Sequence, residues 1–306
     1  SLVSLLWLVS IGSLLNFLFC LLLSTPAGRI RLRWDPTFWK STLLRSWPIG
    51  VSIAFNLVYF KADTFILSRV RSLEEVGIYG AAYRVLEILI TVPFMYAGIL
   101  LPVLSQVWSQ KDTTRFGSYV SRSLEVMLYL IAPLLIGTWI LGPKIMTVVS
   151  GPAFATSGMV LRILVIAVAI IYLNTITSHA IVALNVQRRM IPIYILVAIF
   201  TLAGYLLFIP RYGMWAAAWL TVASEAGVFL GSWLITQTQS RFALERQTVL
   251  ATIASATLMG GVVWLLRDAS LFFSIGAAMI VYPLALLGLG AITRERLRQI
   301  LKPSSS

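Results

Sequence analysis

The sequence predicts an all-α integral membrane protein, a bundle of about nine transmembrane helices. Hydrophobic residues make up 59% of the 306 residues and charged residues only 11%, which is typical of membrane rather than soluble chains. The apolar residues come in runs of about 20, the length that a helix needs to cross the hydrocarbon core. Lys and Arg gather in alternate loops between these runs, as expected for a chain that crosses a membrane many times.

Nine apolar runs are long enough to span a bilayer. They cover residues 2–24, 46–68, 76–106, 120–142, 157–184, 190–209, 213–236, 249–266 and 271–292. The first run lacks the basic leading region and the small-residue cleavage site of a signal peptide, so we interpret it as a membrane helix. Because the chain starts with Ser1 and enters an apolar run at once, we expect a fragment whose upstream portion is missing.

Basic residues orient the predicted spans. One set of loops holds Arg29, Arg31, Arg33, Lys40, Arg45, Lys111, Arg115, Arg122, Arg188, Arg189, Arg241, Arg246, Arg294, Arg296, Arg298 and Lys302. The opposite set holds only Arg69, Arg71, Lys144, Arg211 and Arg267. The basic loops are expected in the cytoplasm, together with the carboxyl terminus. The net charge of +13 is then mainly a topology signal, and we expect no nucleic-acid partner.

The loops between the spans are short. None carries a Gly-rich phosphate-binding motif or a cluster of metal ligands, which a soluble catalytic domain would be expected to supply. We therefore expect no enzymatic activity, no cofactor and no metal ion.

Four ionisable residues lie inside two neighbouring predicted spans: Lys61 and Asp63 in 46–68, and Arg84 and Glu87 in 76–106. Unpaired at mid-bilayer they would cost roughly 2.5–3.5 kcal/mol each, on the order of 10 kcal/mol together. Arg84 and Glu87 are at i and i+3 and share one helix face. With about 1.5 Å of rise per residue, Lys61 and Arg84 lie at one depth. One arrangement pairs Asp63 with Arg84 and Glu87 with Lys61.

These charges have two interpretations. They could line a water-filled cavity that presents cations to an anionic substrate, or they could form an ion-pair clasp that only fixes two helices. We favour the cavity, because charges inside a membrane usually line pathways. Glu225, near the middle of the run 213–236, is either a proton-binding carboxylate or a hydrogen-bonded packing residue. In the same run Gly227 and Gly231 have a GxxxG spacing, which favours close helix contact.

Two segments carry a resemblance to a known family. VGIYGAAYRVLEILITVPFMYAGILLPVLSQ, residues 76–106, resembles the eighth span of polysaccharide flippases of the multidrug, oligosaccharidyl-lipid and polysaccharide (MOP) exporter superfamily, which includes O-antigen flippases. KADTFILSRVRSLEEVG, residues 61–77, resembles the Asp-bearing seventh span of that family and its outer loop. In related lipid II flippases the Arg and Glu that match Arg84 and Glu87 line the central cavity. Those proteins have Asp directly before the Arg, where this chain has Tyr83.

The resemblance also implies a domain organisation, because the nine predicted spans resemble spans six to fourteen of a fourteen-span member. Residues 1–24 are then the last helix of an otherwise missing N-terminal lobe, and 25–45 a cytoplasmic interlobe linker. Residues 46–236 form a six-helix C-terminal transporter lobe, 249–292 two additional transmembrane helices, and 293–306 a cytoplasmic tail.

The function implied by the resemblance is that of a flippase for lipid-linked oligosaccharide, an undecaprenyl-pyrophosphate glycan used for lipopolysaccharide or other cell-surface polysaccharide. It would work by alternating access in the bacterial inner membrane. Lys61 and Arg84 would hold the pyrophosphate, and Asp63, Glu87 and Glu225 are candidate coupling residues. Membrane lipids and the missing lobe are the other expected partners.

Three alternatives remain. A multidrug or cation antiporter of the same superfamily is expected to have an acidic, aromatic cavity, whereas Lys61 and Arg84 would repel cations. A membrane-embedded glycan ligase is expected to carry essential polar residues in a sizeable outer loop, and the outer loops here are short. The third alternative is a lobe that serves as a scaffold without transporting anything.

Overall fold

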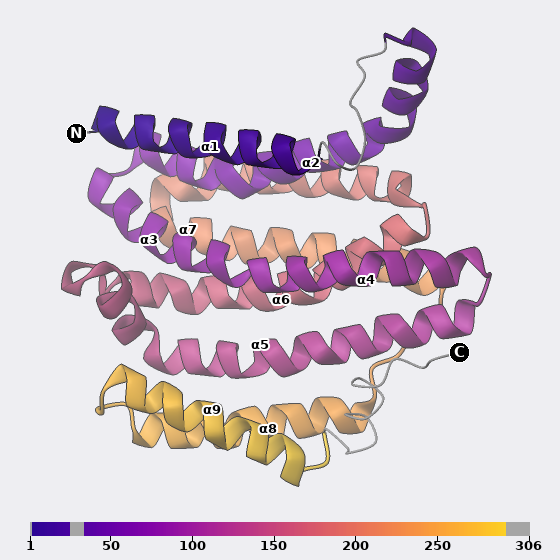
Figure 1. Ribbon diagram of the computed structural model, residues 1–306. Helices are drawn as coiled ribbons and strands as arrows, with labels where there is room; N and C mark the ends of the chain where they lie inside the picture. The colour runs from indigo at the N-terminus through magenta and orange to yellow at the C-terminus, as the bar shows by residue number, and fades with distance from the viewer. Residues whose placement is uncertain (1, 25–33, 292–306) are drawn as a thin grey trace. The chain divides into compact units, whose positions relative to one another are not determined.

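The computed structural model describes residues 2–24 and 34–291, and within them the chain is helical with no strands (Figure 1). The α-helices are α1 Leu2–Ser24, α2 Pro36–Val70, α3 Leu73–Leu89, α4 Thr91–Ser109, α5 Thr113–Ser150, α6 Ser157–Ala183, α7 Ile191–Gln239, α8 Arg246–Leu265 and α9 Leu271–Gly288. Short 3₁₀ turns, Pro152–Phe154 and Gln187–Met190, precede α6 and α7. The prediction of an all-α bundle of about nine helices is confirmed.

The chain divides into two compact units, Ser1–Trp47 and Pro48–Ser306, which we call the amino-terminal and carboxyl-terminal units. The boundary falls inside α2. Residues 25–33 of the expected linker and the expected tail 293–306 lie outside the described residues. The domain boundaries expected from the resemblance stay predictions.

In the amino-terminal unit the start of α2 follows from its sequence. The backbone N–H of Phe38 donates to the Asp35 carboxylate at 3.0 Å, so Asp35 caps the helix. Pro36 takes the first helical position, where a missing N–H costs nothing and a fixed φ suits the helix.

Six helical segments in the described part of the chain are long and apolar enough to cross a membrane. They are Leu73–Ser109, Thr113–Ser150, Ser157–Ala183, Gln187–Gln239, Arg246–Leu265 and Leu271–Gly288. The longest of these segments, Gln187–Gln239, contains two antiparallel halves. Helix α1 contains a shorter apolar stretch, Trp7–Leu23. Together with its relatives described below, this makes the chain a multi-pass membrane protein.

The predicted span 76–106 is broken into α3 and α4 at Ile90, and Pro93 explains the break. Proline has no N–H, so Pro93 cannot donate to the carbonyl of Leu89 four residues earlier. The Tyr172 hydroxyl of α6 donates to that carbonyl at 3.0 Å. Pro133 in α5 likewise frees the carbonyl of Tyr129, and the Tyr282 hydroxyl of α9 donates to it at 2.8 Å. Both carbonyls that lose a partner to proline thus accept a hydrogen bond from a neighbouring helix.

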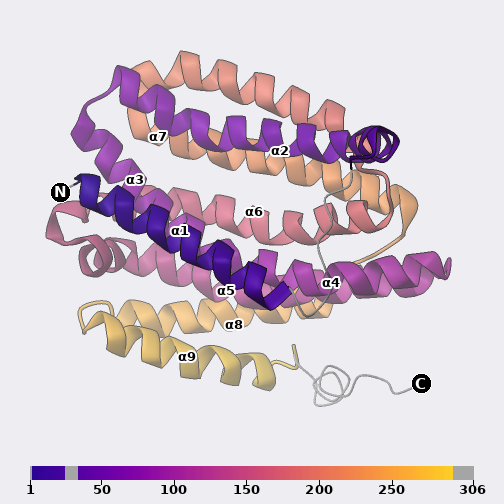
Figure 2. The ribbon, with the colours of Figure 1, turned by 45° about the horizontal axis from the view of Figure 1, so that its top comes forward.

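The predicted spans 190–209 and 213–236 are the two halves of α7, and Gly213 joins them. Gly213 has φ 57° and ψ −136°, a conformation that glycine adopts without the strain other residues incur. The halves fold back on each other, as Figures 1 and 2 show. A Cβ on Gly231 would lie 2.6 Å from Ile193, and one on Gly227 would lie 3.0 Å from Val197. The close contact predicted from the GxxxG spacing is confirmed, and it is made between the halves of one hairpin.

Residues on both sides of the α2–α3 turn bind the backbone around this break. Arg71 donates to the carbonyl of Arg211 at 2.7 Å and to that of Ile209 at 3.4 Å, at the end of the first half of α7. The Glu75 carboxylate accepts the N–H of Met214 at 2.7 Å, at the start of the second half. Helix ends leave such carbonyls and N–H groups without intrahelical partners. The α2–α3 turn therefore caps both halves of α7.

The core of the carboxyl-terminal unit is centred on α6, which packs against α3, α4, α5 and α7. Figure 2 shows α6 between α7 and α5, with α8 and α9 beyond α5. The α5–α6 contact is very close, because a Cβ on Gly158 would lie 2.3 Å from the backbone nitrogen of Pro143. Helices α8 and α9 form a hairpin that packs on α5.

Candidate functional site

The predicted intramembrane charges lie where α2 and α3 pack against each other. The short turn at Arg71 and Ser72 joins the two helices, and Ser72 caps α3 by accepting the N–H of Glu75 at 3.2 Å. This turn is short enough to make the helices antiparallel neighbours, as predicted, and side chains from both helices then meet about two to four helical turns away from it.

Glu87 joins two of the basic residues. Its carboxylate forms ion pairs with Lys61 from α2 and with Arg84, one helical turn away, at 2.9 Å. Lys61 also lies over the ring of Tyr83, 5.3 Å from its centroid. The predicted pairing of Glu87 with Lys61 is confirmed. We call Lys61, Arg84 and Glu87 the charged patch; its net formal charge is +1.

The predicted pairing of Asp63 with Arg84 is wrong. Asp63 is fully buried, whereas the Arg84 side chain is 79% exposed and pairs with Glu87. The reason is helical geometry: residues two apart, such as Lys61 and Asp63, point to different sides of α2. Lys61 reaches the exposed face of α3, and Asp63 faces the core.

Buried Asp63 is held by hydrogen bonds instead of a charge. The hydroxyl of Tyr79 in α3 donates to one carboxylate oxygen. The backbone N–H and the hydroxyl of Thr64 donate to the other, the hydroxyl at 3.2 Å. Buried polar groups require such partners. Sequence reasoning missed Tyr79; the available signal was its spacing from Tyr83, which places both rings on one face of α3, 5.6 Å apart.

Glu225 is apart from the charged patch. It is buried in the second half of α7, 3% exposed, and makes no hydrogen bond or ion pair with any residue that the structure describes. Its electrostatic neighbours are Tyr83, Tyr194 and Tyr205. The nearby Thr221 and Ser224 hydroxyls donate to carbonyls of their own helix. Both interpretations of Glu225, a proton-binding carboxylate and a hydrogen-bonded packing residue, stay predictions.

The five predicted residues thus fall into three environments. Lys61, Arg84 and Glu87 form a patch on the surface of the carboxyl-terminal unit. Asp63 lies directly behind that patch, bonded to Tyr79. Glu225 is buried on α7 among tyrosines. The patch can bind an anion with its excess positive charge, and the two secluded carboxylates have surroundings in which a proton could be held.

The chain is similar in sequence to several known proteins. The family model described as "Polysaccharide biosynthesis protein" matches residues 1–108. The probable flippase AglR of Haloferax volcanii is 24% identical over 264 residues, which are 81% of this chain and 54% of that protein. The succinoglycan biosynthesis transport protein ExoT of Rhizobium meliloti is 30% identical over 124 residues, 40% of this chain and 24% of that protein. The matched residues therefore span about half the length of AglR and about a quarter of that of ExoT.

Solved structures share the fold. The lipid II flippase MurJ in an inward closed conformation superposes with a TM-score of 0.68 at 13% identity, over 89% of this chain and 57% of that one. A MOP superfamily transporter from Pyrococcus furiosus has a TM-score of 0.53 at 17% identity, over 85% of this chain and 63% of that one. The family match, the flippase and transport relatives and this fold together confirm the resemblance seen in the sequence: the chain is similar to proteins of polysaccharide biosynthesis and flipping, and it shares the fold of MOP superfamily transporters.

Proposed function

We propose that this chain is part of a flippase that moves an undecaprenyl-pyrophosphate-linked oligosaccharide across the bacterial inner membrane for cell-surface polysaccharide synthesis. The carboxyl terminus would lie in the cytoplasm. A partner lobe, preceding this chain in the complete protein or supplied by another chain, would close the transport cavity. The relatives named for flipping and polysaccharide transport support this reading.

The charged patch carries the proposal. Arg84 is 79% and Lys61 51% exposed at the side chain, yet Arg84 lies within a membrane-length apolar segment. An arginine facing lipid there would cost roughly 2.5–3.5 kcal/mol or more. A water-filled cavity between two lobes removes that cost, and transporters place their substrate sites at such an interface near the midplane.

The charge of the patch suits the proposed substrate. Glu87 offsets one of the two basic residues, so the patch keeps an excess positive charge. A pyrophosphate can displace the carboxylate from Lys61 or Arg84 and accept charge-assisted hydrogen bonds. The glycan would then lie in the cavity and the lipid tail in the bilayer. The same excess charge disfavours cationic drugs as substrates.

Alternating access needs a source of energy, and we assign coupling to the carboxylates. Asp63 lies next to the patch but is shielded from it by burial, and Glu225 is buried without an ion-pair partner in the described residues. Proton exchange at either group would change the charge balance behind the substrate site. Transport rates that stay the same with and without a proton or sodium gradient would exclude this coupling.

The test is outward movement of a fluorescent undecaprenyl-pyrophosphate glycan in liposomes that contain the complete protein. We expect Arg84→Ala and Glu87→Gln to lower the rate at least about tenfold, and Arg122→Ala, an exposed arginine on α5, to leave it unchanged. Insertion and thermal unfolding are measured for each variant. Unchanged transport in the first two variants would reduce the patch to a clasp between α2 and α3. No transport by the parent protein would overturn the proposal.

A further inference from the structure

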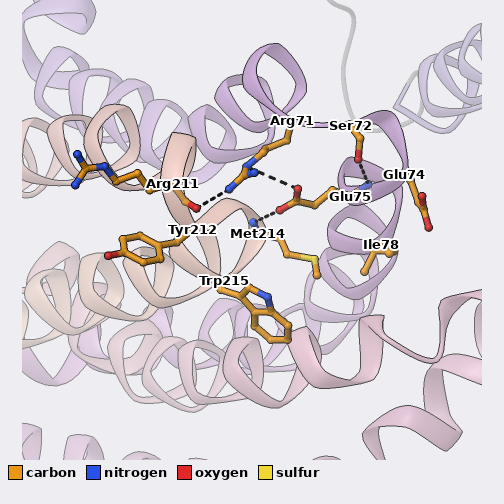
Figure 3. A pocket seen from close by; sticks show the side chains of 9 residues that line it. All are labelled: Arg71, Ser72, Glu74, Glu75, Ile78, Arg211, Tyr212, Met214 and Trp215. Carbon is orange, nitrogen blue, oxygen red and sulfur yellow. Dashed lines mark hydrogen bonds and ion pairs between the residues drawn. The ribbon is translucent and has the colours of Figure 1, made fainter.

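A pocket of about 550 Å³ opens in the carboxyl-terminal unit, away from the charged patch, where the α2–α3 turn meets the break in α7 (Figure 3). Its volume is within the range of about 300–1,000 Å³ that is usual for small-molecule sites. The residues around it are Arg71, Ser72, Glu74, Glu75, Ile78, Arg211, Tyr212, Met214 and Trp215. By the predicted topology this end of the bundle faces outside.

The floor of the pocket is rigid. Arg71 and Glu75 are engaged with the backbone of α7 through Arg211 and Met214, as Figure 3 shows. Arg71 and Glu75 also form an ion pair, with 3.8 Å between Arg71 Nε and Glu75 Oε2. The charged ends of Arg71 and Glu75 are already held in place. Their side chains therefore lose little conformational entropy when a ligand binds, which favours binding.

The rim of the pocket offers groups for hydrogen bonding. Arg211 and Glu74 border the pocket on opposite sides in Figure 3, with their charged ends directed outward at its edge, and their side chains have no hydrogen bond or ion pair within the described residues. With Arg71 and Glu75 they make two positive and two negative charges. A balanced set does not favour a phosphate, which needs excess positive charge. It does suit a neutral ligand with many hydroxyl groups, since carboxylate accepts and guanidinium donates hydrogen bonds.

Two aromatic side chains complete the pocket. Tyr212 is 59% and Trp215 40% exposed, and both lie at its lower side in Figure 3. The flat apolar face of a sugar ring packs on aromatic rings of this kind, while its hydroxyls bond to polar groups at the edge. Aromatic surface with a few convergent polar groups is the usual composition of a ligand site.

An apolar groove of about 440 Å³ lies beside the pocket, between residues from both halves of α7. Its lining residues are Phe208, Tyr212, Trp215, Ala216, Trp219, Leu220 and Ala223. Tyr212 and Trp215 line both hollows, so the polar pocket and the apolar groove are adjacent. Together they fit an amphiphile whose polar part is uncharged and whose tail is a hydrocarbon.

We propose that this site binds a glycolipid, with a neutral sugar in the pocket and the hydrocarbon in the groove. The identification of its natural ligand with the transported lipid-linked glycan rests on the proposed function. On that reading the charged patch binds the pyrophosphate during transport, and the pocket holds sugars of the glycan at the outer face. We assign the two parts of the substrate by charge: the patch has a net formal charge of +1 and suits the pyrophosphate, whereas the pocket has no net charge and suits the sugars.

Tyr and Trp also gather at membrane interfaces without binding any specific ligand. The experiment therefore has to distinguish this interfacial role of Tyr212 and Trp215 from specific binding of a glycolipid. The complete protein is placed in nanodiscs of phosphatidylethanolamine and phosphatidylglycerol, free of sugar detergents. Binding is measured calorimetrically for hexyl glucoside, hexyl galactoside, hexyl maltoside and hexyl N-acetylglucosaminide. The four corresponding free sugars, hexylphosphocholine and empty nanodiscs are the comparisons.

We expect at least one hexyl glycoside to bind saturably, about tenfold or more tightly than hexylphosphocholine and than its free sugar. Trp215→Ala and Glu74→Gln should each weaken it about tenfold. Trp139→Ala, which removes a 50% exposed tryptophan on α5 outside both hollows, should not. Glu74 is exposed, so its variant is expected to fold, and thermal unfolding checks both.

Several results would overturn the proposal: no saturable binding by any glycoside, equal binding of hexylphosphocholine, or binding that Trp215→Ala and Glu74→Gln leave unchanged. A free sugar that binds as well as its hexyl glycoside would remove the groove from the site. Binding is measured without transport, so the two proposals can fail separately. Glycoside binding without flipping would support the glycolipid site and overturn the proposed flippase function. Flipping without glycoside binding would support the flippase function and overturn the glycolipid site.

Discussion

Replacing Gly213 by alanine tests how the broken helix α7 is held together. A Cβ at this position would lie 1.8 Å from the nearer carboxylate oxygen of Glu75. That oxygen accepts the N–H of Met214. The carboxylate would therefore have to move away, and the backbone would have to keep φ 57° and ψ −136° with a side chain present.

The cost has two parts. A non-glycine residue in such a conformation costs of order 1–3 kcal/mol. Loss of a hydrogen bond to a charged carboxylate costs about 1.5–3 kcal/mol, toward the lower end here because Glu75 is partly exposed. We therefore expect Gly213→Ala to destabilise the protein by about 3–5 kcal/mol, which lowers Tm by on the order of 10 °C.

Thermal unfolding in detergent, followed by tryptophan fluorescence, measures the effect. Gly77→Ala is the matched control: Gly77 lies in α3 with open space around its Cβ position, so alanine there should be neutral or stabilising by up to about 1 kcal/mol. In a protein that already carries Glu75→Ala, the carboxylate is absent. Adding Gly213→Ala to it should therefore cost only the backbone part of the free energy, about 1–3 kcal/mol. A Gly213→Ala protein that melts within about 2 °C of the parent would refute the reasoning.

Three further predictions concern helix contacts and the buried carboxylate. Tyr172→Phe and Tyr282→Phe leave the carbonyls freed by Pro93 and Pro133 unpaired and should each cost about 1–3 kcal/mol, whereas exposed Tyr212→Phe should cost nothing measurable in thermal unfolding. Gly158→Ala should lower Tm more than any of these, because its Cβ would meet the Pro143 backbone at 2.3 Å; a Tm equal to that of Gly77→Ala would contradict this contact. Asp63→Asn still offers one oxygen to the Tyr79 hydroxyl but loses the acceptor for the Thr64 N–H. We therefore expect a lower Tm with folding retained, while any gradient-driven part of transport disappears; full coupling in this variant would remove Asp63 from the mechanism.

The sequence was sufficient for features that depend on composition and short-range periodicity. Runs of apolar residues identify the membrane-length helices because the thickness of the bilayer sets their length. The spacing of Arg84 and Glu87 predicts their common face because a helix brings i and i+3 together. The pair of Lys61 with Glu87 also follows, since a short turn forces α2 and α3 to run antiparallel.

Other features depend on contacts between residues far apart in the chain, which no local pattern reports. Asp63 finds Tyr79 rather than Arg84 because the rotation of α2 about its axis turns it into the core. Two predicted spans join at Gly213 because Arg71 and Glu75 cap the helix ends on both sides of it. The sequence by itself determined a membrane-spanning helical chain with an intramembrane charge cluster. The tertiary structure decided which charges are exposed and which are buried, and it created a neutral pocket from two turns about 140 residues apart, because burial and partners are set by packing.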